Sequence, residues 1–117
     1  MIPIMYRQTE LRGHGREEFG EFNLERFKVL INELPIFKEL EQSVGLQASE
    51  HDWIDISFNG NSDYMLYTLR LHDNRPLWQR LLSGKEIILN LQGLPAVLEI
   101  INIYVSKDRK EFENEYS

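Results

Sequence analysis

Two His-Asp pairs, His51-Asp52 and His72-Asp73, are the residues of this 117-residue chain whose types could do chemistry together. An imidazole beside a carboxylate is the raw material of acid–base catalysis and of metal binding. The pairs stand at the open ends of a predicted β-hairpin with Asn59-Gly60 at its turn. In that register they lie about 13 Å apart at a strand rise of ~3.4 Å, too far for a shared metal ion. A longer hairpin loop would bring them closer, at the expense of a purely apolar core face.

Other chemical motifs are weaker. Arg12 and Arg16 flank Gly13-His14-Gly15, which could form a small anion nest, but the phosphate-loop pattern is missing. No serine stands in a nucleophile-elbow context, and the absence of cysteine excludes disulfides, thiolate nucleophiles and cysteine-based zinc sites. We therefore expect no catalytic residue, no metal site and no cofactor. The alternative is a small ligand-binding domain or enzyme whose pocket uses His14, His51 or His72.

The hairpin that separates the two pairs is the clearest structural signal. Residues 53–58 and 64–71 flank Asn59-Gly60, and this dipeptide favours a two-residue turn that places Ile54 opposite Met65. One side of the hairpin then carries apolar residues that must be core: Ile54, Ile56, Phe58, Met65, Leu69 and Leu71. The other side carries a mixed set: Trp53, Asp55, Ser57, Tyr64, Leu66, Thr68 and Arg70.

Hydrophobic periodicity and turn residues predict the remaining elements. We expect a strand at 2–6, a flexible loop over 8–22, and a helix at 24–34 with Asn23 as its N-cap. A second helix is expected from Pro35 to residue 44, with Gly45 as its C-terminal cap, and a short one over 76–84. Residues 86–91 and 97–105 read as strands, with a helix as the competing interpretation of the second run. A charged helix or tail is expected over 106–117.

This order of elements predicts a single α+β domain, with an antiparallel sheet of four to five strands packed against three to four helices. The net charge of −6 lies in its centre, because residues 39–69 contain no lysine or arginine but six acids: Glu39, Glu41, Glu50, Asp52, Asp55 and Asp63. Such a segment repels nucleic acids and anionic membranes and attracts a basic partner. No apolar run approaches the ~18 residues of a membrane span. The lack of cysteine and of a signal-peptide pattern favours the cytoplasm.

The mixed side of the hairpin is the predicted partner site. Aromatic and aliphatic anchors ringed by charge are typical of protein interfaces. The residues expected to form the site are Trp53, Asp55, Tyr64, Leu66, Glu50, Asp52 and Asp63. A helix that covered this side would instead make Trp53 and Leu66 part of the core.

Size and charge favour a small acidic module that binds and neutralises, or holds, a basic protein such as a toxin or effector. Small immunity proteins have this build, and so do the acidic, often homodimeric chaperones of secreted effectors. Self-association through the same side of the hairpin is a further alternative.

Overall fold

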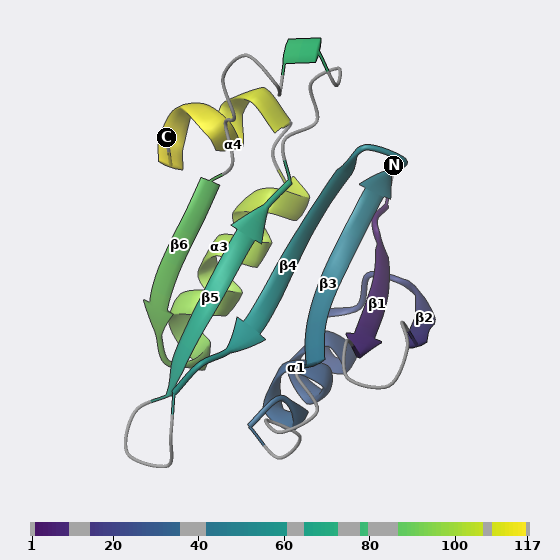
Figure 1. Ribbon diagram of the computed structural model, residues 1–117, viewed down its shortest axis with the longest axis vertical. Helices are drawn as coiled ribbons and strands as arrows, with labels where there is room; N and C mark the ends of the chain where they lie inside the picture. The colour runs from purple at the N-terminus through teal and green to yellow at the C-terminus, as the bar shows by residue number, and fades with distance from the viewer. Residues whose placement is uncertain are drawn as a thin grey trace.

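The computed structural model describes residues 2–9, 15–35, 42–60, 65–72, 78–79, 87–106 and 109–116. Its strands are β1 (Ile4–Thr9), β2 (Gly15–Glu21), β3 (Gln42–Ser49), β4 (Asp52–Phe58), β5 (Leu66–Leu71) and β6 (Ile87–Gln92). Its helices are α1 (Leu24–Glu33), α3 (Leu94–Ser106) and α4 (Arg109–Tyr116). Together these elements form one compact α+β domain, which confirms the predicted class (Figure 1).

The described strands form one antiparallel sheet in the order β2-β1-β3-β4-β5-β6. β3 to β6 follow one another as a meander, whereas β1 lies between β2 and β3. The expected four to five strands are therefore corrected to six. Two of the strands, β2 and β3, come from segments in which the sequence predicts a loop and a helix.

The helices cover one side of this sheet. Figure 1 shows α1 and α3 behind the strands, and Phe112 of α4 joins the same buried cluster. The strands contribute alternate residues to this cluster, among them Met5, Val44, Leu46, Ile54, Ile56, Leu69, Leu71 and Ile87. Burial of these apolar side chains is the main favourable term in folding. No helix of the described ranges lies on the opposite side of the sheet.

The first helix forms as its sequence predicts. Asn23 has an extended backbone, and its side chain accepts a hydrogen bond from the N–H of Arg26 at 3.1 Å. This bond satisfies one of the N–H groups that a helix start leaves without a partner. Phe27 and Ile31 are fully buried, and the helix ends before Pro35, which cannot continue the hydrogen-bond ladder.

The expected loop over 8–22 is wrong for most of its length. β1 continues to Thr9, and β2 pairs with it in antiparallel register. An ion pair across the two strands joins Arg7 to Glu17 at 2.7 Å. Charged residues occupy β2 because it is an exposed edge strand, so its sequence lacks the apolar alternation of a buried strand.

The expected second helix is wrong from residue 42 onward, because 42–49 form β3; residues 36–41 lie outside the described ranges. Val44 and Leu46 are buried on the helix-covered side, and Gly45 and Gln47 alternate with them. This alternation is the pattern of a β-strand with one buried side, whereas the prediction of a helix depended on Gly45 as its C-terminal cap. Gly45 has a different role, described below.

The run 97–105 is helical, so the prediction of a strand is wrong and the competing interpretation holds. Val97, Ile100, Ile101 and Tyr104 all lie on one buried face of α3. Gly93, in the left-handed region at φ 86°, turns the chain from β6 into this helix. Packing of four buried residues outweighs the modest preference of β-branched residues for strands.

The residues of the hairpin lie on the predicted sides of the sheet, but the two strands pair in a different register. Ile54 lies opposite Leu71 instead of Met65, and the pairing closes at Phe58 and Tyr67. The two-residue turn at Asn59-Gly60 is therefore wrong. Ile54, Ile56, Leu69 and Leu71 are nevertheless buried as predicted, because a shift by an even number of residues leaves every side chain on its side. Met65, expected in the core, is 38% exposed.

Two expectations concern the C-terminal half. The short helix expected over 76–84 lies mostly outside the described ranges; Trp78 within it is 63% exposed. α4 occupies Arg109–Tyr116 within the expected charged segment 106–117. None of the described helices is both long and apolar enough to cross a membrane.

Glycine is required at position 45, where the ring of Tyr6 packs against the sheet. A Cβ atom at this position would lie 2.3 Å from the carbonyl oxygen of Ile54 and 2.5 Å from the Tyr6 ring. Real Cβ atoms do not approach other heavy atoms this closely, and the Ile54 oxygen belongs to the backbone of the sheet. The absence of a side chain therefore lets the ring lie directly on the strand.

Replacing Gly45 with alanine should lower the free energy of unfolding by about 2–3 kcal/mol, because overpacking forces the sheet or the ring to move. Urea unfolding measures the change. Gly15→Ala is the matched control: Gly15 is also a strand residue, and nothing lies within 4 Å of its added Cβ. Equal losses in the two variants would contradict this role of Gly45.

Candidate partner-binding face

The side of the sheet opposite the helices is the candidate functional surface, and we call it the open face. Alternation along each strand and the observed registers assign residues to it. Its described members include Tyr6, Gly45, Gln47, Trp53, Asp55, Ser57, Leu66, Thr68, Arg70, Ile88 and Asn90.

Tyr6 lies across the middle of the open face. Its ring covers Gly45, and its hydroxyl donates a hydrogen bond to Asp55 Oδ1 on the second strand over. Although it belongs to the open face, Tyr6 is only 2% exposed. Burial, together with the negative charge of Asp55, raises the pKa of this phenol well above its ordinary value of 10.0. Tyr6 is therefore a fixed, protonated hydrogen-bond donor at neutral pH.

Arg16 of the edge strand β2 covers Tyr6 from outside. Its guanidinium carbon lies 4.2 Å from the centroid of the Tyr6 ring, which is a cation–π contact. The same guanidinium donates to the side-chain oxygen of Gln47 and lies 3.5 Å from the carboxylate of Glu18. These contacts tie β2 to the middle of the sheet and place a positive charge on the open face.

Trp53 forms the second aromatic group of the open face. Its ring stacks on the ring of His72, with centroids 3.5 Å apart and planes at 8°. The β4–β5 ladder sets this pair, since the N–H of His72 donates to the carbonyl of Trp53 at 3.0 Å. Both residues are half-buried, so the stack remains partly exposed to solvent.

Polar side chains join the strands at the other end of the open face. Asn59 donates to the hydroxyl of Thr68, which in turn donates to Asn90 Oδ1 at 3.1 Å. Leu66 follows this row and lies opposite Gln92 on β6. The chain of hydrogen bonds runs across β5 and fixes side chains that would otherwise lose entropy on binding.

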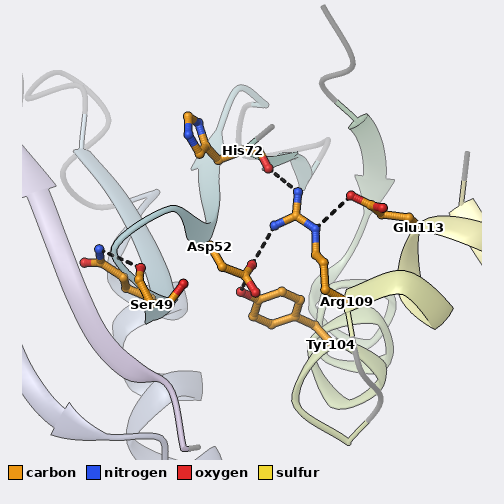
Figure 2. Close-up of polar contacts among 7 residues, drawn as sticks. Ser49, Asp52, His72, Tyr104, Arg109 and Glu113 are labelled. Carbon is orange, nitrogen blue, oxygen red and sulfur yellow. Dashed lines mark hydrogen bonds and ion pairs between the residues drawn. The ribbon is translucent and has the colours of Figure 1, made fainter. Parts of the chain in front are cut away.

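Asp52 lies on the helix-covered side, away from the open face. Figure 2 shows its carboxylate between Arg109 and Tyr104, at 2.6 Å from Arg109 Nη1 and 2.9 Å from the Tyr104 hydroxyl. Arg109 also bonds Glu113 at 2.9 Å and donates to the carbonyl of His72. Burial first, and then the charge of Asp52, raise the pKa of Tyr104 above its ordinary value of 10.0.

The Arg109 cluster has a structural consequence for the open face. Arg109 belongs to α4, and the His72 backbone that it holds carries the ring stacked on Trp53. The arginine side chain is only 12% exposed, so its bonds are shielded from water and strong. The cluster thus docks α4 and fixes one end of the Trp53–His72 stack.

The structure brings together part of the predicted site. Trp53, Asp55 and Leu66 share the open face as expected. Asp52 belongs to the Arg109 cluster, and Glu50 lies in the exposed turn between β3 and β4. Tyr64 and Asp63 lie outside the described ranges.

Sequence reasoning missed four residues that shape this region: Tyr6, Arg16, His72 as the partner of Trp53, and Arg109. A lone glycine between the apolar residues of a strand signals a close approach from a large side chain, and Gly45 is such a residue. That signal could have indicated an aromatic ring on the neighbouring strand, but not which one. Nothing near Arg109 in the sequence pointed to Asp52.

The structure also redistributes the acidic segment. Arg70 lies opposite Asp55, Arg16 covers Tyr6, and Arg109 pairs with Asp52. The open face therefore carries both signs of charge, although the sequence around its aromatic residues is purely acidic.

The histidines occupy other positions than the sequence register gave them. His72 lies opposite Trp53, while His51 is exposed in the preceding turn, and His14 falls outside the described ranges. The observed register places His72 beside Trp53 without cost to the core face of the hairpin. Within the described part of the chain, no three His, Asp or Glu side chains are arranged to hold a metal ion.

No protein-family model, curated protein or solved structure matches this chain. Its function therefore has to be inferred from the open face itself.

The raised pKa values of Tyr6 and Tyr104 predict a loss of stability in alkali. Below pH 10 both phenols are protonated in folded and unfolded chains, so their contribution to stability is complete. Above pH 10 only the unfolded chain releases these protons, and stability falls by up to about 1.4 kcal/mol per pH unit for each phenol. Urea unfolding at several pH values should show a shallower decline above pH 10 for Tyr6→Phe and Tyr104→Phe than for the parent chain. Parallel declines would show that neither phenol is held protonated by the fold.

Proposed function

We propose that this chain is a cytoplasmic protein-binding module that binds a basic partner protein through its open face. Binding would neutralise or hold that partner, in the manner of an immunity protein acting on a toxin. The observation that carries the proposal is Trp53, a half-buried aromatic ring fixed by stacking on His72, on a sheet surface that no described helix covers.

Trp53 is suited to act as an anchor. A partner that buries a rotamer-rich side chain loses about 0.5–1.5 kcal/mol of ordering entropy for each one immobilised. Stacking on His72 already restricts Trp53, so this side chain has lost much of that entropy on folding and more of the contact energy remains for binding. Tyr6, 2% exposed beneath Arg16, instead holds Asp55 in place. Tryptophan and tyrosine are the residues most enriched at interface hot spots.

Charge supports a basic partner. The chain carries a net charge of −6, and Glu50 is exposed in the turn that precedes Trp53. Long-range attraction raises the rate of encounter and depends on the total charge. Local contacts at the open face involve both signs, since Arg16 and Arg70 accompany Asp55. We therefore assign the acidic charge to steering and the aromatic and polar groups to specificity.

Replacing Trp53 with alanine should weaken the complex by at least about 2 kcal/mol, because a central aromatic anchor is lost. The immobilised chain is used to capture partners from its native host, these are identified by mass spectrometry, and the affinity of the purified partner is then measured by calorimetry. The proposal expects a basic protein whose binding weakens as salt concentration rises.

Trp78→Ala provides the matched control, because Trp78 is the other tryptophan of the chain, is 63% exposed and belongs to none of the strands that form the open face. It should leave the affinity unchanged. Circular dichroism establishes that both variants remain folded. Equal affinities of Trp53→Ala and the parent chain, or an acidic partner, would rule out the proposed interface.

A further inference from the structure

The two edges of the sheet differ in how they are protected. β2 forms one edge. A β-bulge interrupts its pairing with β1, and the strand contains four charged residues: Arg16, Glu17, Glu18 and Glu21. β6 forms the other edge with the sequence IILNLQ, which contains neither charge nor proline. Charges and bulges are the usual devices that keep an edge strand from pairing with another chain. β6 has none of them.

The hydrogen-bonding direction of β6 follows from its last contact with β5. The N–H of Gly93 donates to the carbonyl of Met65 at 2.7 Å, which continues the β5–β6 ladder. Successive residues of an antiparallel strand direct their backbone groups to opposite neighbours. Ile88, Asn90 and Gln92 therefore point their N–H and C=O groups away from β5, at the outer edge of the sheet.

We propose that β6 pairs antiparallel with β6 of a second copy of this chain, in a register centred on Asn90. In this register Asn90 faces its own counterpart, and Ile88 faces Gln92 of the second copy. All three outward-pointing residues of each strand then exchange backbone hydrogen bonds across the two-fold axis. A closed, self-complementary contact of this kind is the commonest form of homodimer.

Side chains also complement one another in this register. On the helix-covered side Leu89 lies beside Leu91 of the second copy, and both leucines are only partly buried in one chain. On the open-face side Ile88, 48% exposed, gains the aliphatic part of Gln92 as a neighbour. A register shifted by one residue would pair the helix-covered side of one copy with the open-face side of the other, and Leu89 would lie beside Asn90 of the second copy.

The absence of charge on β6 permits pairing with a second copy. Two chains of net charge −6 repel one another overall, so self-association requires a contact surface that adds no further repulsion. β6 is such a surface, whereas β2 would bring three glutamates towards the same three glutamates. Because paired strands keep like sides together, the dimer would present both open faces on the same side of one continuous sheet. This inference does not depend on what the open face binds.

The test uses charge at the two-fold axis. The parent chain should sediment at twice the mass of one chain and dissociate on dilution. Asn90→Lys places two like charges opposite each other and should weaken self-association by at least about tenfold. Asn90→Glu should do the same alone. An equimolar mixture of the Lys and Glu variants should restore the dimer, because unlike charges then meet at the axis.

Glu21→Lys on the opposite edge is the control and should leave the dimer intact. Asn90→Pro is a second route to the same result, since it removes an outward-pointing N–H and no backbone bond to β5. Like the Lys and Glu variants, it also loses the side-chain bond from Thr68. A parent chain of single-chain mass at every concentration overturns the proposal, as does a dimer indifferent to every Asn90 variant. A mixture of Lys and Glu variants that stays monomeric overturns the register centred on Asn90.

Discussion

Burial of a single side of the sheet is the constraint on which the rest of this structure depends. The strands place alternate apolar side chains on one side, and α1, α3 and α4 remove them from water there. Every other residue of those strands is consequently turned away from the helices, including Trp53 and Asp55. The opposite side then has to be held together by its own contacts, and Tyr6 on Gly45, reaching Asp55, supplies the central one.

Local pattern was sufficient for part of the fold. Residue spacing alone predicts the start of α1 with Asn23 as its N-cap. It also predicts which residues of β4 and β5 face the core, and this assignment remains correct although the hairpin register moves by six residues. The register itself could not be predicted from Asn59-Gly60, which favours a two-residue turn, whereas the observed pairing closes at Phe58 and Tyr67. Two segments have apolar patterns compatible with either a helix or a strand, and tertiary packing determines which one forms. Residues 97–105 form a helix packed against β6, and residues 42–49 form a strand between β1 and β4.

The candidate site divides in the same way. Trp53, Asp55 and Leu66 were predictable because they follow from alternation in one hairpin. Tyr6 meets Asp55 across 49 residues of sequence, and Arg109 meets Asp52 across 57, so no window of sequence contains either pair. For the same reason the acidic segment 39–69, which contains no lysine or arginine, pairs in the folded chain with arginines from other segments. Linear charge predicts the sign of a distant partner, whereas the local charge of a surface depends on the fold.

Accessibility of the open face is the central claim, and thiol labelling tests it most directly, because the chain has no native cysteine. Ser57→Cys places a thiol on the open face between β3 and β5, and Val44→Cys places one under the helices. In the native protein we predict that the Ser57 variant reacts with a thiol reagent without any opening of the domain, while the Val44 variant reacts only when the domain opens. Equal protection of the two thiols would show that both sides of the sheet are covered and would contradict the account.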